Sequence, residues 1–532
     1  MSVTQGRADN LAMTSPLLRR RDLNRAALAW ALGALALPRA LRAQQGVAST
    51  PWSSDPFTLG VASGQPRPDG IVLWTRLAPA TDDGAASMAR PACAVRWELY
   101  ADAALRVPVR QGEVLTDAQQ AHSVHVVVQG LQPARPYWYR FVCGDAVSPV
   151  GRTRTAPAPD ADVARLRIAL ASCQHYEQGF YAAHREIAAS DVDVVMFVGD
   201  YIYEGSNPQT ALRPHGTPTP QTLAQYRERH ALYKRDAQLQ AAHAAHPWLL
   251  TWDDHEVVND YAGPFDPAWD DARFVQRRAA AYRAYFEHQP IALGPQGASL
   301  RLHDRFAWGT LADLWMLDGR QYRSQHACPD PRIDHGRIVT GCADLADASR
   351  TLLGREQEAW LAQGLTSSAR RWKLVGQSTQ VSRTGTDTPE GRRVWTDGWD
   401  GYPQARERML QGVRDARVRD VVMLGGDVHR HVAADLRVQP NDTASPVIAS
   451  EFVTTSISSH GGSAAAMRQL MQHNPDVKHA RGDERGWALI DVTSASALCE
   501  FRGTPHPALA DAQLARQAVF AVEAGRAGVV TG

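Results

Sequence analysis

Three titratable side chains follow one short apolar run, and their types and spacing could bind a ligand. The run Val421–Leu424 is predicted to be a buried strand, two glycines end it, and Asp427, His429 and His431 follow at a spacing of two. An extended backbone would place these three side chains on one face. A carboxylate and an imidazole at the end of a buried strand can form a ligand site, and the alternative is a polar loop after a core strand.

Polar residues also follow five other predicted strands. The seven predicted strands are residues 166–171, 192–198, 248–252, 311–317, 372–375, 421–424 and 447–453. The polar groups that follow the first six are Cys173, Asp200 to Tyr203, Asp253 to Asn259, Asp318 to Arg320, Gln377 with Ser378, and Asp427 to His429. Because parallel strands share a direction, we expect these groups to meet at one edge of a sheet. The alternative is six unrelated solvated loops.

The side chains expected at this edge are of the types that bind metal ions. They offer four oxygen donors, one imidazole, one thiolate and one phenolate, from Asp200, Asp254, Asn259, Asp427, His429, Cys173 and Tyr203. This number of ligands indicates two metal ions, with Asp200 as the bridge because a carboxylate has two oxygens. Such a site polarises a phosphoryl oxygen and generates hydroxide near neutral pH. The sequence contains no serine nucleophile elbow, phosphate-binding glycine loop or zinc-finger spacing.

Two further residues have candidate catalytic roles. His255, next to Asp254, can donate a proton to a leaving oxygen or, alternatively, support a ligand through a hydrogen bond. Arg320 can pair with phosphate, although a structural salt bridge is the commoner role of such an arginine. Cys173 and Tyr203 have a competing interpretation as buried core residues.

The pattern along the chain predicts an all-β region followed by an α/β region. Short alternating runs indicate a fibronectin-like β-sandwich domain over residues 52–157. Leu131 to Pro133, followed by Tyr137 and Tyr139, resemble the corner of such modules, where a tyrosine hydroxyl ties a strand to its loop. From 165 to 503, strands alternate with helices, which indicates one sheet with crossover helices. The helices are predicted at 223–243, 270–288, 355–364 and 404–414, and residues 504–532 are predicted to be a helical tail.

The chain length and the net charge indicate how many domains to expect and which partners are excluded. A chain of 532 residues is too long for one ordinary core, so we expect two or more domains. The formal net charge is +1, and it becomes −4 without the first 43 residues, which hold seven arginines and two aspartates. No basic stripe remains, which argues against nucleic acid as a partner.

The first 43 residues are predicted to be an export signal. Arg19 to Arg21 precede an apolar run, Ala26 to Leu37, which is too short to span a bilayer, and Ala43 ends a small-residue cleavage site. The arginine cluster resembles a twin-arginine signal, and the alternative is an ordinary secretory signal. No later run is apolar enough for a membrane helix, so we expect a periplasmic or secreted protein.

Six cysteines would then enter an oxidising compartment. Two disulfides are conceivable, Cys93 with Cys143 and Cys328 with Cys342, and spacing proves neither. Cys499 lies in a strand-like run and is predicted to be a buried, small hydrophobic residue.

Several motifs together resemble one family. GD, DDHE and GGDVH resemble the metallophosphoesterase signature, with Asp254 and Asp427 at positions where that superfamily usually has Asn and His. With ASCQ, GDYIYEG, WDDHEVVNDY, LDGRQYR, WDGYPQAR and EFVTTSISS, the chain resembles the alkaline phosphatase D (PhoD) family from Phe57 to the end of the sheet. The resemblance implies a ferric-iron and calcium enzyme that hydrolyses phosphate monoesters and diesters.

Carried over by position, the resemblance divides the ligands between two metals. Cys173, Asp200, Tyr203 and His429 are implied for Fe³⁺, and Ca²⁺ would be bound by Asp254, Asn259 and Asp427. The expected function is a secreted phosphoric ester hydrolase. The alternatives are a phospholipase D-type phosphodiesterase, a non-catalytic secreted metal-binding protein, and a zinc hydrolase acting on amides, for which the site has too few histidines.

Overall fold

A computed structural model describes residues 52, 54–79, 92–265, 271–330, 332, 333 and 335–532. The chain divides into two units, Met1–Ala48 and Ser49–Gly532, and the description below concerns the second. The predicted export signal lies outside the described residues. Within the described part, none of the helices combines the length and the apolar character that a membrane span requires.

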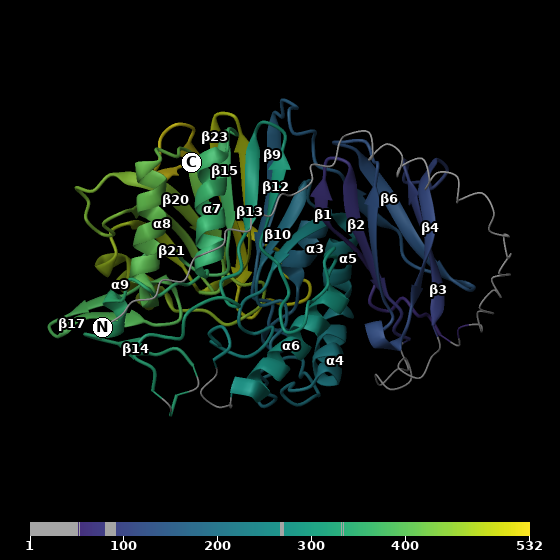
Figure 1. Cartoon of the computed structure of the whole chain (residues 1–532), viewed down its shortest axis with the longest axis horizontal. Coiled ribbons are helices and arrows are strands. Elements are labelled where there is room, and N and C mark those ends of the chain that lie inside the picture. Colours follow the sequence, from purple (N-terminus) through teal and green to yellow (C-terminus); the bar gives the residue numbers. More distant parts are fainter. Residues whose placement is uncertain (1–51, 53, 80–91, 266–270, 331, 334) are drawn as a thin grey trace, which may run out of the picture. The chain divides into compact units, whose positions relative to one another are not determined.

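One sheet of ten strands joins the N-terminal region to the C-terminal end of the chain (Figure 1). Its centre is three parallel strands, β9 (Arg165–Ala171), β10 (Val194–Val198) and β11 (Pro247–Thr251). The strands on either side are β1 (Val61–Arg67), β2 (Gly70–Arg76), β5 (Ser123–Gln129), β22 (Glu484–Thr493), β23 (Ser496–Pro505), β24 (Ala515–Glu523) and β25 (Val530–Thr531). The predicted strands of the first half of the α/β region therefore share this sheet.

The predicted strands of the second half form a separate sheet of seven strands. The parallel strands are β13 (Ala312–Met316), β15 (Trp372–Gly376), β18 (Val421–Gly425) and β20 (Val447–Val453). The others are β12 (Asp304–Trp308), β19 (His431–Arg437) and β21 (Val477–Arg481). The prediction of a single sheet was wrong, because residue periodicity identifies a strand but carries no information on which strand it pairs with.

The two sheets pack face to face and helices cover both outer faces. Alternate residues of β10 show this: Met196 contacts the second sheet, while Phe197 packs among helices. The ten-stranded sheet is covered by α3 (Ala182–Ala189), α4 (Leu223–Lys234), α5 (Ala237–Ala245) and α6 (Asp271–His288). The seven-stranded sheet is covered by α7 (Arg355–Ser367), α8 (Pro403–Asp415) and α9 (Ala464–His473).

One predicted helix is divided in two. The residues predicted as a helix over 223–243 form α4 and α5, and Asp236 lies between them. The Asp236 carboxylate accepts hydrogen bonds from the backbone N–H groups of Gln238 and Leu239, so it caps α5. A capping aspartate inside a long apolar repeat therefore marks the break.

The N-terminal region consists of strands, as predicted. A five-stranded sheet, formed by β4 (Pro108–Thr116), β3 (Cys93–Tyr100), β6 (Pro136–Cys143), β7 (Ala146–Val147) and β8 (Gly151–Arg154), shares a core with β1, β2 and β5. The Tyr137 hydroxyl accepts the backbone N–H of Gln132 at 3.0 Å, as the sequence indicated. β1 also pairs with β11, so strands of this region extend the main sheet. The fibronectin-like class and the domain boundaries stay predictions.

The predicted helical tail over 504–532 is wrong. This segment contains β24, which pairs with β23, and β25, which pairs with β24. Phe520 and Val522 alternate along β24 and both enter the core between the sheets, whereas Leu509 is exposed. The segment also matches a helical repeat, but the open edge of β23 provides hydrogen-bond partners and burial that favour a strand.

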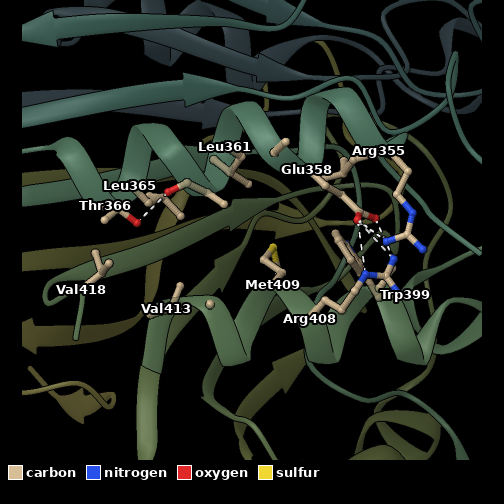
Figure 2. A pocket seen from close by; sticks show the side chains of 15 residues that line it. Arg355, Glu358, Leu361, Leu365, Thr366, Trp399, Arg408, Met409, Val413 and Val418 are labelled. Carbon is tan, nitrogen blue, oxygen red and sulfur yellow. Dashed lines mark hydrogen bonds and ion pairs between the residues drawn. The ribbon is translucent and has the colours of Figure 1, made fainter. Parts of the chain in front are cut away.

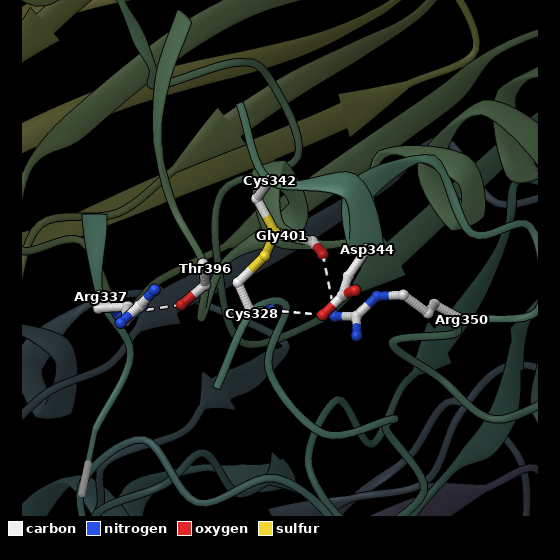
Figure 3. Close-up of a disulfide and its surroundings, with 7 residues drawn as sticks. All are labelled: Cys328, Arg337, Cys342, Asp344, Arg350, Thr396 and Gly401. Atoms are coloured by element: carbon white, nitrogen blue, oxygen red, sulfur yellow. Dashed lines mark hydrogen bonds between the residues drawn. A yellow bond between two sulfur atoms is a disulfide. The ribbon is translucent and has the colours of Figure 1, made fainter. Parts of the chain in front are cut away.

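A disulfide closes the loop between β13 and α7. Cys328 and Cys342 are bonded, which confirms one of the two conceivable pairs (Figure 3). The backbone N–H of Cys328 donates to the carboxylate of Asp344 at 2.7 Å. Inside this loop, the short strand β14 (Ile338–Val339) pairs with β17 (Gly391–Trp395), which also pairs with β16 (Thr386–Thr388). Cys499 is buried in β23 as predicted, and the pairing of Cys93 with Cys143 stays a prediction.

Candidate metal centre and active site

The chain turns sharply where three central strands end. Cys173 after β9, Asp200 after β10, and Asp427 and His429 after β18 have φ angles of 61°, 58°, 62° and 51°. Few residues other than glycine adopt this left-handed conformation, and those that do cluster at functional sites. The predicted extended backbone from Asp427 to His429 is therefore wrong, and turns rather than strand alternation position these side chains.

Two glycines let the backbones approach closely at these turns. A Cβ atom on Gly199 would lie 2.6 Å from the Cβ atom of Asp253, and Gly199 itself has a φ of +114°. A Cβ atom on Gly426 would lie 2.5 Å from the Ser172 hydroxyl oxygen. The second contact joins the ends of β18 and β9, so it brings the two sheets together at the site.

One group of candidate ligands combines residues from both sheets. The ligand atoms of Cys173, Asp200 and His429 all lie within 4.8 Å of one another. The hydroxyl of Tyr203 lies 2.8 Å from Asp200 Oδ2 and 3.0 Å from His429 Nε2. The four residues that the sequence assigned to one metal are therefore neighbours.

A second group shares Asp200 with the first. Ligand atoms of Asp200, Asp254 and His255 lie within 4.8 Å of one another. Asp200 is buried, with 1% of its surface exposed, and its Oδ1 atom has no hydrogen-bond partner. A shared carboxylate with one unpartnered oxygen is the arrangement that a bridging ligand requires.

Asp427 lies outside these two groups, which consist of histidine, cysteine and carboxylate residues. Asp427 accepts a hydrogen bond from the Thr379 hydroxyl, and Asn259 donates its backbone N–H to Glu204 at 2.8 Å. Their role as metal ligands stays a proposal. His431 lies farther into the core, where it is fully buried and stacked on Phe501 at 4.4 Å.

Burial and mutual repulsion make Asp200 and Asp427 difficult to ionise without a cation, whereas Asp254 is also buried but Arg320 and His255 lower its pKa to about 2. Burial, with Asp254 and Asp253 nearby, raises the pKa of Asp200 well above its ordinary value. Burial and the same two aspartates raise the pKa of Asp427 to about 8. Burial also raises the pKa of the Cys173 thiol and lowers that of His429 to about 3. A bound cation would stabilise the ionised carboxylates and so offset the free-energy cost of ionising them in a buried site. The residues present therefore fit a metal centre.

Arg320 has a different environment from the one its predicted catalytic role requires. Its guanidinium is fully buried and donates to both oxygens of Asp253, at 2.6 and 3.1 Å, and to both oxygens of Asp397, at 2.7 and 2.8 Å. It also lies 3.4 Å from Asp254 Oδ1. Because these carboxylates occupy its N–H groups, the geometry supports the structural alternative and not a clamp on phosphate.

The sequence reading missed the carboxylates that hold the site together. Glu256 accepts the backbone N–H groups of Asp200, Tyr201 and Asp253, so it ties the end of β10 to the end of β11. Glu204 accepts a hydrogen bond from His255 Nδ1 at 2.7 Å. Glu204 lies in the motif GDYIYEG and Glu256 in the motif DDHE, so the sequence marked both segments as part of the site. Residue type alone does not distinguish a carboxylate that binds a metal from one that supports a ligand through hydrogen bonds.

An apolar cavity lies away from these residues. It has a volume of about 370 Å³ and lies between α7 and α8 (Figure 2). Its wall includes Leu361, Met409 and Trp399, and an ion pair between Arg408 and Glu358 lies at one end. None of the predicted metal ligands lines this cavity, so we do not assign it to the chemistry.

Comparison with known proteins agrees with this geometry. The model of the PhoD-like phosphatase family matches residues 168–501, and that of the PhoD-like phosphatase N-terminal domain matches residues 42–157. Alkaline phosphatase D of Bacillus subtilis (strain 168) is 41% identical over 492 residues, which are 90% of this chain and 82% of that protein. A solved structure of PhoD is similar with a TM-score of 0.86 at 40% identity, covering 91% of this chain and 93% of that one. The chain therefore belongs to the PhoD-like phosphatase family.

Proposed function

We propose that this protein is a metal-dependent phosphoric ester hydrolase with a two-metal centre. The observation that carries the proposal is the position of Asp200, which belongs to both groups of candidate ligands and has an unpartnered oxygen. Membership of the PhoD-like phosphatase family and the similarity to alkaline phosphatase D support hydrolysis of phosphate esters.

The donor atoms differ between the two sides of Asp200. Cys173, Tyr203 and His429 offer sulfur, phenol oxygen and imidazole nitrogen, which suit iron, whereas Asp254, Asn259 and Asp427 offer oxygens, which suit calcium. Bound Fe³⁺ and Ca²⁺ would supply charge that activates water and stabilises the phosphoryl transition state.

His255 is the group that we assign to the leaving oxygen. Burial alone would lower its pKa, but the carboxylates of Glu204, Asp254 and Asp200 outweigh burial and raise the pKa well above its ordinary value. A protonated imidazole can donate a proton to the alkoxide as the phosphorus–oxygen bond breaks.

Location and substrate belong to the same proposal. The arginine cluster at Arg19 to Arg21 and the following apolar run support export, by the twin-arginine route, to the periplasm or beyond. Monoester and diester hydrolysis are both compatible with the site. Phospholipid headgroup hydrolysis, and metal binding without turnover, remain the alternatives that the next experiment separates.

The test uses natively exported protein and the substitution Asp200→Asn. We expect wild-type protein to contain iron and calcium by elemental analysis and to hydrolyse p-nitrophenyl phosphate, bis(p-nitrophenyl) phosphate or both. Asp200→Asn should lose at least about 10³-fold in kcat/KM because one oxygen of the bridge becomes an amide nitrogen. Undiminished hydrolysis in Asp200→Asn would refute the mechanism. Metal content without turnover of either ester or of phosphatidylcholine vesicles would favour the non-catalytic alternative.

A further inference from the structure

A second cavity lies at the start of α7 and is separate from both groups of candidate ligands. Its volume is about 770 Å³, and its wall includes the first turn of α7 and the aromatic side chains of His303, Tyr322 and Trp360. None of the candidate metal ligands lines it. It adjoins the apolar cavity between α7 and α8, since Leu353 and Arg355 line both. Its own lining is rich in basic and aromatic groups.

The first turn of α7, which forms part of the cavity wall, has no side-chain cap. The helix begins at Arg355, directly after Gly354, and no side chain accepts a hydrogen bond from its first N–H groups. Gly354 has a φ of +76°, and a Cβ atom there would lie 2.6 Å from the Cβ atom of Tyr322, so a capping side chain does not fit. The free N–H groups and the dipole of such a helix end attract anions.

Two arginines of the cavity wall have hydrogen-bonding capacity that the protein does not use. Arg301 is exposed, and it forms neither a hydrogen bond nor an ion pair with any residue that the structure describes. Arg323 is only 2% exposed, and its Nη2 atom has no hydrogen-bond partner, although its other nitrogens bind Gly319 and Asp397. Because buried polar groups are nearly always paired, the Nη2 atom indicates that an acceptor belongs there.

The charged groups that line the cavity are mainly positive. Three of them are guanidinium groups and one is a carboxylate, that of Glu356. The carboxylates that pair with Arg323 and Arg355 also pair with arginines outside the cavity, so they offset only part of this charge. Burial and the charge of Arg301 lower the pKa of His303. An anion in the cavity would therefore meet a favourable potential.

The aromatic side chains can bind a flat ring. The ring centroid of His303 lies 5.2 Å from that of Trp360 and 5.9 Å from that of Tyr322, edge to face in both pairs. Tyr322 is 36% exposed, so part of its ring is open to a ligand. Aromatic side chains of this kind stack on nucleobases. The cavity thus combines groups that bind an anion with groups that bind a flat ring.

We propose that this cavity is a binding site for a nucleoside monophosphate, separate from the metal centre. One helix end and two arginines, Arg301 and Arg323, match a single phosphate group as hydrogen-bond donors. Tyr322 and Trp360 match a single base. Binding at this cavity requires no hydrolysis, so the proposal goes beyond the proposed function and does not depend on it.

A crystal of the holoenzyme with a brominated ligand tests the position. The probe is a brominated analogue of adenosine monophosphate in which carbon replaces the ester oxygen, so the metal centre cannot hydrolyse it. We expect the anomalous peak of bromine beside Tyr322 and Trp360, and the phosphonate group at the first turn of α7. Density for the probe at the metal centre alone would overturn the assignment.

Binding in solution tests each part of the site with the unbrominated phosphonate. A fluorotryptophan resonance, assigned by its loss in Trp360→Phe, reports the ligand in this cavity. Arg301→Gln should weaken binding about tenfold, because a hydrogen bond to a charged group is lost. Tyr322→Leu should also weaken binding about tenfold, through lost stacking, and leave the affinity for inorganic phosphate unchanged. Arg516→Gln, at an exposed arginine of β24, is the control and should change neither affinity.

Three results would overturn the proposal. The Trp360 resonance would fail to respond to the phosphonate at concentrations up to about 1 mM. Inorganic phosphate or adenosine would bind as tightly as the phosphonate, or Arg301→Gln and Tyr322→Leu would both bind it as wild-type protein does. A protein that binds the phosphonate in this cavity but hydrolyses no phosphate ester would refute the proposed function alone, so the two failures are distinguishable.

Discussion

Glu256 is the residue that explains how strained turns persist at the site. Left-handed residues other than glycine cost on the order of 1–3 kcal/mol each, so they require surrounding contacts that fix them. The Glu256 carboxylate accepts N–H groups from Asp200 and Tyr201 on one turn and Asp253 on the next. The backbone that presents the candidate bridging ligand is thus held by a residue that has no direct role in the chemistry.

Arg320 provides a stability prediction at this scale. Arg320→Lys keeps a charge but cannot bind Asp253 and Asp397 through two bonds each, so we expect the free energy of unfolding to fall by about 3–5 kcal/mol. The KM of the folded enzyme should change little. Urea unfolding measures the free energy of unfolding, and steady-state kinetics measure KM.

Arg165→Lys is the control for Arg320→Lys. The ion pair of Arg165 with Asp491 is half-exposed, so its loss should cost less than about 1 kcal/mol. Full stability of Arg320→Lys combined with a KM raised tenfold would contradict the structural assignment and restore the role of Arg320 as a phosphate clamp.

Tyr203 provides a spectroscopic prediction. If its phenol oxygen binds iron, natively exported protein should show a visible phenolate-to-iron absorption band, and Tyr203→Phe should lose this band. The iron content of Tyr203→Phe should decrease by a smaller fraction than the absorption band, because Cys173, Asp200 and His429 remain as candidate iron ligands. Tyr181→Phe, a buried tyrosine whose hydroxyl donates to the Gln174 carbonyl, should keep the band. A band that persists in Tyr203→Phe would exclude Tyr203 as an iron ligand.

At the scale of elements, periodicity predicted the strands and helices better than their partners. Apolar runs such as Val421–Leu424 are buried strands as predicted. A strand that is buried on both faces has consecutive apolar residues, and this pattern can be recognised in the local sequence. The division into two sheets left no such signal, since pairing is a contact between distant residues. The same lack of a local signal explains why residues 504–532 were wrongly predicted to be helical. The pairing of β24 with β23, which lies beyond the local sequence pattern, favours a strand there. The candidate ligands were identified by residue type and motif, and their binding of metal stays a proposal. The left-handed turns and the support by Glu204 and Glu256 depend on tertiary contacts.

The disulfide-closed loop gives a prediction at this scale. Gly336, inside the loop, donates its N–H to Asp260 at 2.9 Å, and the N–H of Asp260 donates to Asp254 at 2.7 Å. Removing the bond with Cys328→Ser/Cys342→Ser should lower the free energy of unfolding by about 2–4 kcal/mol, because the unfolded chain regains freedom. If Asp254 binds calcium as proposed, the half-saturating calcium concentration should also rise, because the loop supports Asp254 through Asp260.

Reductant supplies the control for the disulfide prediction. It should shift the urea midpoint of wild-type protein toward that of the double variant and leave the double variant unchanged. If the urea midpoint of wild-type protein does not change after complete reduction, verified by thiol counting, the prediction is contradicted.

At the scale of the whole molecule, buried neutral histidines make the fold sensitive to acid. Burial lowers the pKa of His184 and of His230 to about 3, against about 6.5 in an unfolded chain. The unfolded state therefore binds more protons below pH 6.5. Each histidine contributes its full stabilisation above pH 6.5 and loses it as the pH falls toward 3, at roughly 1.4 kcal/mol per pH unit.

His184→Gln tests this pH dependence. Glutamine can still donate to the Gln174 side-chain oxygen, which His184 Nε2 contacts at 2.6 Å, but it does not titrate. The variant should lose less stability than wild-type protein between pH 7 and pH 5, by urea unfolding at matched metal content. Parallel loss in the two proteins would show that His184 does not contribute to acid sensitivity.

The central claim is that Asp200 bridges two metals, and anomalous X-ray diffraction from crystals of the natively exported holoenzyme tests it most directly. Data on both sides of the iron absorption edge should place iron within bonding distance of Cys173 Sγ, His429 Nε2 and one oxygen of Asp200. A second cation, calcium by its scattering, should contact the other oxygen of Asp200 and Asp254. A single metal peak, or two peaks of which either does not touch Asp200, would contradict the account.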